Sequence, residues 1–409
     1  MNVKKHYLFC PGPVNIAQNV KEAVFNEIGH REKEFSELLL SLNSKLLQVY
    51  QVKNKKLYQP VFITGSGTSA NESVLSSVVH SKRILTLSNG EFGDRLYEIS
   101  KIHNKNTFLL NFGWGSRMDP EKVVEVIKKN KIQMIAMVHH ETSIGVINPI
   151  EKVGKIAQKN KLIFMVDTVS SVGAEKIDIE KANITFTTGT SGKAIGSFPG
   201  IGFVIGKKKE FEKLKENAPK TAYLNLYKFY YYSSTLSQTP NTPGVQLLFA
   251  LEQALKNILA IGITTRRRNI KEKALMLRKG MKELGLSFYL PDGEMSSVLT
   301  TVNLPAYIDI ETLKLKLKQK NIVVYNGKGP LTNKVFQVGN IGEFSERDIA
   351  YFLKTLGSIL KAYKPKVTVA HSKKINNNEI AILNPNILYN DSASPIGRVR
   401  WKLIAQLEL

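Results

Sequence analysis

Two short apolar runs, each ending in a polar turn, constrain the fold of this chain more than any other feature. Residues Leu162 to Val166 have the length and the β-branched content of a buried parallel strand, and Asp167 follows directly. A second apolar run, Ile184 to Thr187, leads into a turn of small and hydroxyl residues that carries Lys193. Because open α/β sheets bind ligands at the carboxyl ends of their strands, we expect Asp167 and Lys193 at one ligand site.

One lysine and one carboxylate at a shared site are typical of pyridoxal 5'-phosphate chemistry. A lysine holds the aldehyde of this cofactor as a Schiff base, and a carboxylate keeps the pyridine nitrogen protonated so that the ring can accept electrons. Taken alone, Asp167 is more simply a helix cap, and Lys193 is more simply a solvated loop lysine. Their occurrence together, after two consecutive strands, favours the cofactor and predicts that both residues are catalytic.

A second turn of small residues lies upstream. Val61 to Thr64 is predicted to be a strand, and Gly65 to Glu72 leads from it into a helix. Backbone N–H groups at such a turn, together with the helix dipole, can hold a phosphate. The turn is neither a Walker loop nor a dinucleotide fingerprint, because the lysine of the first and the glycine spacing of the second are absent.

These segments resemble the cofactor region of the class V, fold type I aminotransferases. The likeness is carried by VDTVSSVGAEKIDI at 166–179 and TSGKAIGSFPGIGFVIG at 190–206, and it extends from about Tyr7 to about Leu360. Within the family, the chain is most similar to 2-aminoethylphosphonate aminotransferases, followed by alanine–glyoxylate and serine–pyruvate aminotransferases. The resemblance implies an α/β fold with a mostly parallel seven-stranded sheet between helices in a large domain, and a smaller C-terminal α+β domain.

The resemblance also implies the residues that contact the pyridoxal phosphate. They are Ser66, Gly67, Thr68, Phe92, Thr142, Asp167, Val169, Lys193 and Thr242. Residues 66–68 match the phosphate turn. Phe92 matches the position whose ring stacks on the pyridine, and Val169 would cover the opposite face. A core role for Phe92 is the alternative, although the flanking Gly90 and Gly93 favour a turn that faces a ligand.

Two further positions follow from the family pattern. Residues 139–145 match HxETSxG, in which a hydroxyl reaches the phenolic oxygen of the cofactor; we assign Thr142 to this role, with Ser143 as the alternative. A metal site at His139, His140 and Glu141 is disfavoured because adjacent residues of an extended chain point in opposite directions. Thr242 would come from the neighbouring subunit, which implies a homodimer with shared active sites.

The predicted substrate contacts are Gln337 and Arg31. Relatives normally carry an arginine at the position of Gln337, where it binds the substrate carboxylate through two hydrogen bonds. A glutamine offers an amide donor without a charge, so we consider Arg31 and Lys328 as sources of the missing charge. For Arg31, a surface ion pair with Glu32 or Glu34 is an equal alternative.

A chain of 409 residues is expected to form two domains. The predicted parts are an N-terminal segment near the active site at 1–14, a large cofactor-binding domain at 15–257, a small C-terminal domain at 258–362, and a basic extension of unknown role at 363–409. Asn15 is expected to cap a helix that continues to about Ile28, and Ser287 to Leu290 is expected to be a strand of the small domain.

The net charge of +24 raises the alternative of a basic binding protein on the same fold that has lost catalysis. Its densest piece, Arg266 to Lys273, continues into an apolar helical pattern, so these charges are expected on the exposed face of a helix at 265–284. No apolar stretch reaches membrane-spanning length, and the N-terminus lacks the apolar core of a signal peptide. We therefore expect no nucleic-acid or membrane partner and a cytoplasmic location.

The single cysteine, Cys10, permits no internal disulfide and no cysteine-based metal site, and no metal is expected. Its place in a Cys-Pro-Gly-Pro turn also argues against a cysteine desulfurase. The predicted reaction is transamination of 2-aminoethylphosphonate to phosphonoacetaldehyde, with a 2-oxo acid such as pyruvate as acceptor. The alternatives are an alanine–glyoxylate or serine–pyruvate aminotransferase, and a lyase or decarboxylase on the same scaffold.

Overall fold

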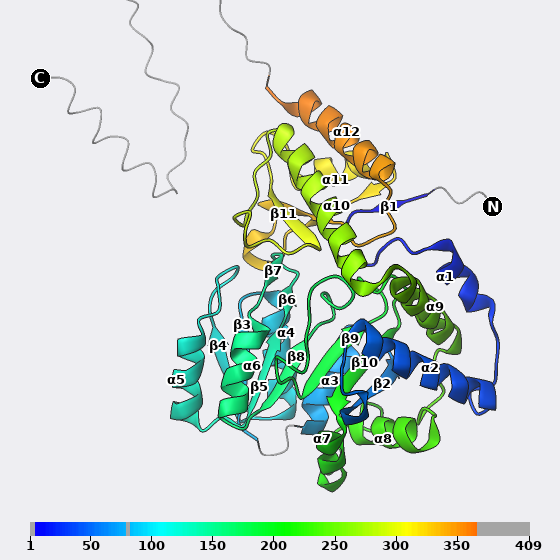
Figure 1. The fold of residues 1–409 in the computed structure, drawn as a ribbon. Helices are drawn as coiled ribbons and strands as arrows, with labels where there is room; N and C mark the ends of the chain where they lie inside the picture. The colour runs from blue at the N-terminus through cyan, green and yellow to red at the C-terminus, as the bar shows by residue number, and fades with distance from the viewer. Residues whose placement is uncertain (1–4, 79–81, 366–409) are drawn as a thin grey trace, which may run out of the picture. The chain divides into compact units, whose positions relative to one another are not determined.

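The structure, a computed structural model, describes residues 5–78 and 82–365, and a seven-stranded sheet forms its centre (Figure 1). The strand order is β2-β10-β9-β8-β5-β3-β4. The strands are β2 (Tyr58–Thr64), β3 (Ile84–Ser88), β4 (Thr107–Asn111), β5 (Met134–Val138), β8 (Ile163–Asp167), β9 (Phe186–Thr190) and β10 (Ile201–Lys207). Only β10 runs antiparallel to its neighbours. The predicted mostly parallel sheet is confirmed.

Helices cover both faces of this sheet, which explains why its strands are almost continuously apolar. Along β5, Ile135 and Met137 belong to the core on one face, whereas Met134, Ala136 and Val138 belong to the core on the other. The first core includes residues of α2 (Lys33–Val49), α5 (Pro120–Asn130), α6 (Ile150–Lys159) and α9 (Val245–Ile261). The second includes residues of α3 (Gly67–Val78), α4 (Glu91–His103), α7 (Lys208–Glu212) and α8 (Leu226–Tyr231).

A smaller antiparallel sheet, in the order β11-β14-β13, forms the C-terminal part. Its strands and helices are β11 (Leu299–Asn303), β13 (Tyr325–Asn326), β14 (Val335–Gly339), α10 (Ile263–Glu283), α11 (Ile310–Lys318) and α12 (Glu346–Tyr363). The N-terminal segment joins this part: β1 (Tyr7–Leu8) pairs with β12 (Ile322–Val323), and the Phe9 ring lies 4.2 Å from that of Phe344. The predicted domain boundary between residues 257 and 258 falls inside α9, and residues up to Lys364 form one compact unit. Most of the predicted extension, residues 366–409, lies outside the described residues.

Short helical turns complete the described chain. They are η1 (Ala23–Phe25), η2 (Lys55–Leu57), η3 (Lys213–Glu216), η5 (Gly329–Leu331) and a π-helical turn, η4 (Tyr232–Leu236). No single helix within 5–78 and 82–365 is long and apolar enough to cross a membrane. α9 and α10 pass that test only as a joined pair, which is bent by 89°.

Asn15 does not cap a helix as predicted. α1 (Gln18–Glu22) starts after Ala17, and only one turn of it forms before the chain tightens into η1. The Asn15 side chain instead accepts a hydrogen bond from the backbone N–H of Leu8 and donates one to the carbonyl of His6. Its side-chain amide is therefore used to fix the N-terminal segment.

Two other predictions for the C-terminal part need correction. Residues 287–290 form a single bridge, between Phe288 and Val302, instead of a strand. In α10, Arg266 does not lie on an exposed face: its guanidinium donates to the carbonyl of Ala194 at 2.6 Å and to that of Gly173. Part of the basic run therefore supports the turn that carries Lys193, because Ala194 follows that lysine directly.

Candidate active site

A cavity of about 280 Å³ opens at the carboxyl ends of β8 and β9. Seven of the predicted site residues line it together: Ser66, Gly67, Thr68, Phe92, Asp167, Val169 and Lys193. Gly12 and Pro13 of the N-terminal segment line it as well. Strand order explains the meeting, because parallel neighbouring strands end at the same edge of the sheet.

Lys193 extends into this cavity from the turn after β9. Its ammonium donates a hydrogen bond to the carbonyl of Pro11 at 2.9 Å, and its aliphatic stem passes so close to Gly12 that a Cβ there would lie 2.7 Å from Lys193 Cδ. Burial lowers the pKa of Lys193 to about 8, with Asp167 acting in the opposite direction. A useful fraction of this amine is therefore neutral near physiological pH, as a nucleophilic lysine requires.

Asp167 ends β8 and is buried, with 6% of its surface exposed. One carboxylate oxygen accepts from the side-chain amide of Asn71 at 2.6 Å, and the other accepts from the backbone N–H of Val169 at 2.8 Å. Burial raises the pKa of Asp167, and these hydrogen bonds and the charge of Lys193 oppose the rise. Within the described residues the carboxylate has no ion-pair partner, so a cationic ring nitrogen would satisfy it.

Asn71 is a site residue that the sequence analysis missed. It lies one turn into α3 and is held in orientation by Thr188, whose hydroxyl donates to its side-chain carbonyl at 2.5 Å. With its carbonyl occupied in this way, its amide must point to Asp167. The sequence does carry a sign of this role: an amide residue stands one helical turn after residues 66–68, on the helix face that is turned toward the strand ends.

The turn that is predicted to hold the phosphate lies between β2 and α3. α3 begins at Gly67, so the first N–H groups of the helix have no partner within the helix. A Cβ on Gly67 would lie 2.6 Å from a methyl group of Val169, so only glycine permits this close approach. An anionic group that reached this helix terminus would be favoured by both the free N–H groups and the helix dipole.

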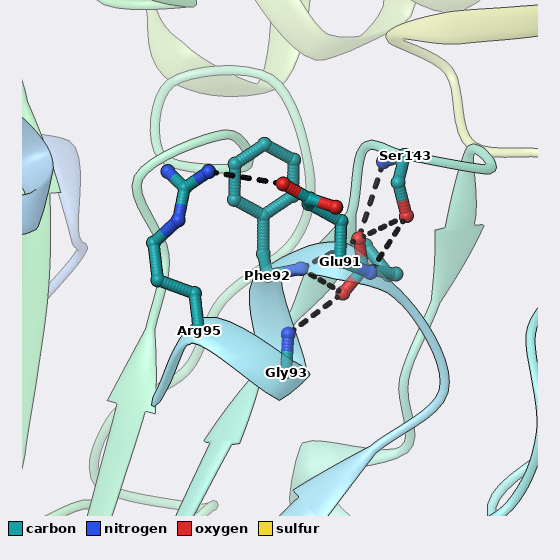
Figure 2. Close-up of polar contacts among 6 residues, drawn as sticks. Glu91, Phe92, Gly93, Arg95 and Ser143 are labelled. Atoms are coloured by element: carbon teal, nitrogen blue, oxygen red, sulfur yellow. Dashed lines mark hydrogen bonds and ion pairs between the residues drawn. The ribbon is translucent and has the colours of Figure 1, made fainter. Parts of the chain in front are cut away.

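Phe92 lies in the first turn of α4, although the sequence analysis placed it in an irregular turn. The helix is capped from outside by Glu141 of β6 (His140–Glu141), which pairs with β7 (Val146–Ile147). The Glu141 carboxylate accepts from the backbone N–H groups of Phe92 and Gly93 at 3.1 and 3.0 Å, and from the Ser143 hydroxyl at 2.5 Å. Figure 2 shows Phe92 and Gly93 beside Ser143 in this arrangement. Glu141 thus fixes the base of the Phe92 side chain.

The structure distinguishes the two candidate hydroxyls of the HxETSxG segment. Ser143 is fully engaged, because its hydroxyl donates to Glu141 and accepts from the backbone N–H of Glu91 at 3.2 Å. Thr142 Oγ1 lies 3.3 Å from the hydroxyl of Ser170, and Ser170 lines the cavity. Thr142 is therefore the better placed of the two, and its contact with the cofactor remains a prediction.

The two histidines of the same segment are buried and neutral. Burial lowers the pKa of His139 to about 3 and that of His140 to about 4. His139 Nδ1 lies 3.0 Å from the Ser171 hydroxyl, and His140 Nδ1 donates to the carbonyl of Ser170 at 3.1 Å. In the described part of the chain, no three His, Cys, Asp or Glu side chains are grouped so that they could hold a metal ion.

Gln337 is placed differently from the predicted substrate contact. It is 1% exposed and does not line the cavity. Its side-chain amide donates to the carbonyls of Thr142 and Ser143 at 3.0 and 2.8 Å. Both amide hydrogens are thus committed to the backbone, and none is left for a substrate.

Arg31 and Thr242 also lie outside the cavity lining of this chain. Arg31 forms neither of the ion pairs considered for it; it donates to the carbonyl of Thr239 at 2.9 Å and to the side chain of Gln238. It therefore lies against the segment that leads to the exposed Thr242. The two predictions are linked, because a partner site that receives Thr242 would have Arg31 nearby.

The cavity as a whole fits pyridoxal phosphate. It combines an amine of lowered pKa, a buried carboxylate that forms no ion pair with another described residue, and a helix whose first N–H groups have no partner within the helix. Phe92 and Val169 supply apolar surface on the same cavity. That these two side chains sandwich the ring remains a prediction.

Known proteins match this chain over nearly its whole described length. The sequence fits the family model described as aminotransferase class V over residues 15–338. An uncharacterized aminotransferase of Methanocaldococcus jannaschii is 32% identical over 365 residues, which cover 88% of this chain and 93% of the relative. A 2-aminoethylphosphonate–pyruvate transaminase of Phocaeicola vulgatus is 27% identical over 364 residues, covering 88% of this chain and 100% of the relative.

A solved structure agrees with these matches. The ureidoglycine–glyoxylate aminotransferase of Bacillus subtilis superposes with a TM-score of 0.83 at 26% identity, covering 90% of this chain and 96% of the other. The residues matched by the family model include β8, which ends in Asp167, and β9 with the turn that carries Lys193.

Proposed function

This chain belongs to the class V aminotransferases, which use pyridoxal 5'-phosphate, and we propose that its amino donor is 2-aminoethylphosphonate. The amino group would pass to a 2-oxo acid such as pyruvate, so that the products are phosphonoacetaldehyde and the corresponding amino acid. The relative from Phocaeicola vulgatus, named for this donor and for pyruvate, supports the proposal. We further propose a cytoplasmic homodimer in which Thr242 of each subunit reaches the site of its partner.

The observation that carries the proposed catalysis is the position of Lys193 and Asp167 on one cavity. When bound, pyridoxal phosphate supplies an aldehyde that exchanges amines and a ring that accepts electrons. Lys193 Nζ, with a pKa of about 8, would accept the proton from the substrate carbon that carries the amino group. Asp167, held by Asn71 and Val169, would keep a positive charge on the ring nitrogen.

The other cavity residues would bind and orient. The free N–H groups at residues 66–68 would hold the phosphate, and Thr142 would donate to the phenolic oxygen. Phe92 and Val169 would define the two faces available to a flat ring. We also propose that the parts at 15–257 and 258–362 act as a large and a small domain.

Absorbance spectroscopy of the purified protein tests this function. We expect a near-visible band from bound pyridoxal phosphate that is lost in Lys193→Ala, together with a fall in turnover of at least about 10⁴-fold. Arg83→Ala, at an exposed position outside the cavity, serves as the control and should keep the band. A Lys193→Ala variant that keeps full turnover would contradict the proposed role.

The donor is tested by half-reactions with 2-aminoethylphosphonate, alanine and serine in turn. We expect 2-aminoethylphosphonate to convert the near-visible band fastest. Conversion by alanine or serine alone would instead favour an alanine–glyoxylate or serine–pyruvate enzyme. The observation in favour of that alternative is the structural relative named for glyoxylate.

A further inference from the structure

We propose that Lys328 and Arg95 together bind the anionic group of the substrate, above the ring of Phe92, and that Gln337 is a positioning residue. This inference deepens the proposed function and rests on it. It assigns the role that the resemblance gives to an arginine at position 337 to two cations from different parts of the chain, one from α4 and one from the loop after β13.

Both cations lie over the same aromatic ring. Lys328 Nζ is 5.0 Å from the centroid of the Phe92 ring, and Arg95 Cζ is 4.9 Å from it. The two charged groups are therefore within about 10 Å of each other, a separation at which like charges repel each other. An anion that lies near both cations would offset this repulsion. Figure 2 shows the Arg95 guanidinium beside the Phe92 ring, with both side chains projecting from α4 in the same direction.

The protein itself neutralises this pair only in part. Among the described residues, the Lys328 ammonium has neither an ion-pair nor a hydrogen-bond partner, and the Arg95 guanidinium has one carboxylate, Glu91, at 3.2 Å. Glu91 and Arg95 are each about one-third exposed, so their ion pair is weak and readily exchanged for another anion. The nearby Glu141 is occupied by backbone N–H groups. An unmatched positive charge therefore remains at this place.

The pair also acts on the reacting centre electrostatically. Arg95 lines the cavity with Lys193, whereas Lys328 lies outside the lining, and the charges of both cations lower the pKa of Lys193. Both cations are thus within electrostatic reach of the amine that handles the substrate. A short substrate with an amine at one end and an anion at the other could place its amine near Lys193 and its anion near this pair at the same time.

The loop that carries Lys328 is held rigidly. Gly329 adopts a φ of 50°, and a Cβ there would lie 2.6 Å from the ring of Trp114, so the loop packs tightly against the segment that follows β4. Only glycine suits both the backbone conformation and the contact. A fixed loop lowers the entropic cost of presenting the Lys328 ammonium to a ligand.

Gln337 connects the two cation-bearing elements. It pairs with Tyr325 of β13, three residues before Lys328, and its amide holds the carbonyls of Thr142 and Ser143. Those residues follow Glu141, which caps the helix that carries Phe92 and Arg95. The side chain at position 337 therefore positions the receptor without contacting the substrate.

The test measures kcat and KM of the holoenzyme for 2-aminoethylphosphonate in Lys328→Ala, Lys328→Arg and the control Lys354→Ala, which removes an equal charge from the exposed face of α12. We expect KM to rise about 10- to 100-fold in Lys328→Ala, with kcat changed less than about threefold, because a charge-assisted hydrogen bond is lost. Lys328→Arg should recover most of the loss, and Lys354→Ala should match the wild type.

Ethylphosphonate, which carries the anion but no amine, gives a readout independent of turnover. Its inhibition constant should rise in Lys328→Ala by the same factor as KM, while the near-visible band and the melting temperature stay unchanged. A KM and an inhibition constant within about twofold of the wild type would overturn the inference. So would a fall in kcat at constant KM, because Lys328 would then act on the chemical step.

The wild-type half-reactions separate the two proposals. If only alanine or serine reacts, the phosphonate assignment fails, and the KM of that carboxylate donor in Lys328→Ala decides the inference. A rise of about tenfold or more would support Lys328 as the receptor of the substrate anion. An unchanged value would overturn it.

Discussion

The cavity has two ends that are built in different ways. At the cofactor end, Asp167 ends β8 and Lys193 follows β9, the neighbouring parallel strand of the same sheet. Asp167 is held by Asn71 of α3, and Lys193 donates to Pro11 of the N-terminal segment. At the substrate end, Arg95 belongs to α4, whereas Lys328 follows a strand of the small sheet. The first end depends on local strand geometry, and the second depends on the packing of the small sheet against the large one.

The contrast predicts how each end tolerates substitution. We expect a change at the cofactor end to remove the chemistry, because the described residues of the cavity lining offer no second lysine and no second carboxylate for the roles proposed for Lys193 and Asp167. At the substrate end, any cation at a suitable place can hold an anion, so Lys328 and Arg95 can take the role that the resemblance assigns to an arginine at position 337. Gln337 then keeps a structural task through its bonds to residues 142 and 143.

The largest effect that sharpens this contrast is expected from Asp167→Asn. The amide keeps the shape and can still accept from Asn71, but it carries no charge to hold a protonated ring nitrogen. We expect kcat to fall about 10³-fold with KM nearly unchanged. Steady-state kinetics measure both, and Asp119→Asn, at a helix cap far along the chain from the cavity residues, is the control. A variant with wild-type kcat would remove the functional difference between the two ends.

The pH dependence of cofactor loading gives the next effect. Only the neutral amine of Lys193 can attack the aldehyde, and burial lowers its pKa to about 8. The loading rate should therefore rise about tenfold from pH 6 to pH 7 and level off above pH 8, whereas an ordinary lysine would keep rising to about pH 10. The measurement is the return of the near-visible band in apoprotein mixed with pyridoxal phosphate.

A model amine, Nα-acetyl-lysine, reacts with the same cofactor under the same conditions and corrects for ionisation of the cofactor itself. Removal of the nearby cation in Lys328→Ala should move the plateau to higher pH, because the charge of Lys328 lowers the pKa of Lys193. A rate that continues to rise up to pH 10 in the wild type would show that the cavity does not perturb this amine.

The same contrast decides how much was predictable from the sequence. The parallel sheet and the meeting of Asp167 with Lys193 follow from apolar runs that end in polar turns, because strand ends share an edge. Asn71 was missed because its role depends on which face of α3 is turned toward Asp167. Lys328 was only one of two candidates, since its position over Phe92 depends on how distant segments pack.

A smaller effect is expected from Gln337→Leu. Loss of the amide leaves two buried backbone carbonyls without their donors, so the free energy of unfolding should fall by about 2 kcal/mol. KM for 2-aminoethylphosphonate should change less than about threefold, because the side chain does not contact the substrate. Urea unfolding and steady-state kinetics provide the two values, and Gln319→Leu at an exposed helix end is the control. A large rise in KM without loss of stability would instead indicate that the side chain at position 337 contacts the substrate.

The smallest effect concerns Glu141, which joins the substrate end to the large sheet by capping α4. In Glu141→Gln, one accepting oxygen becomes an amide NH2 group that faces N–H donors, so the free energy of unfolding should fall by about 1 to 2 kcal/mol. Glu125→Gln, on the exposed face of α5, should have little effect. If Phe92 and Arg95 depend on this cap, the same variant should raise KM for 2-aminoethylphosphonate while cofactor loading stays normal. If the rate of cofactor loading falls by the same factor as KM rises, the two ends of the cavity are structurally coupled. The cap at the substrate end would then also set the position of Lys193.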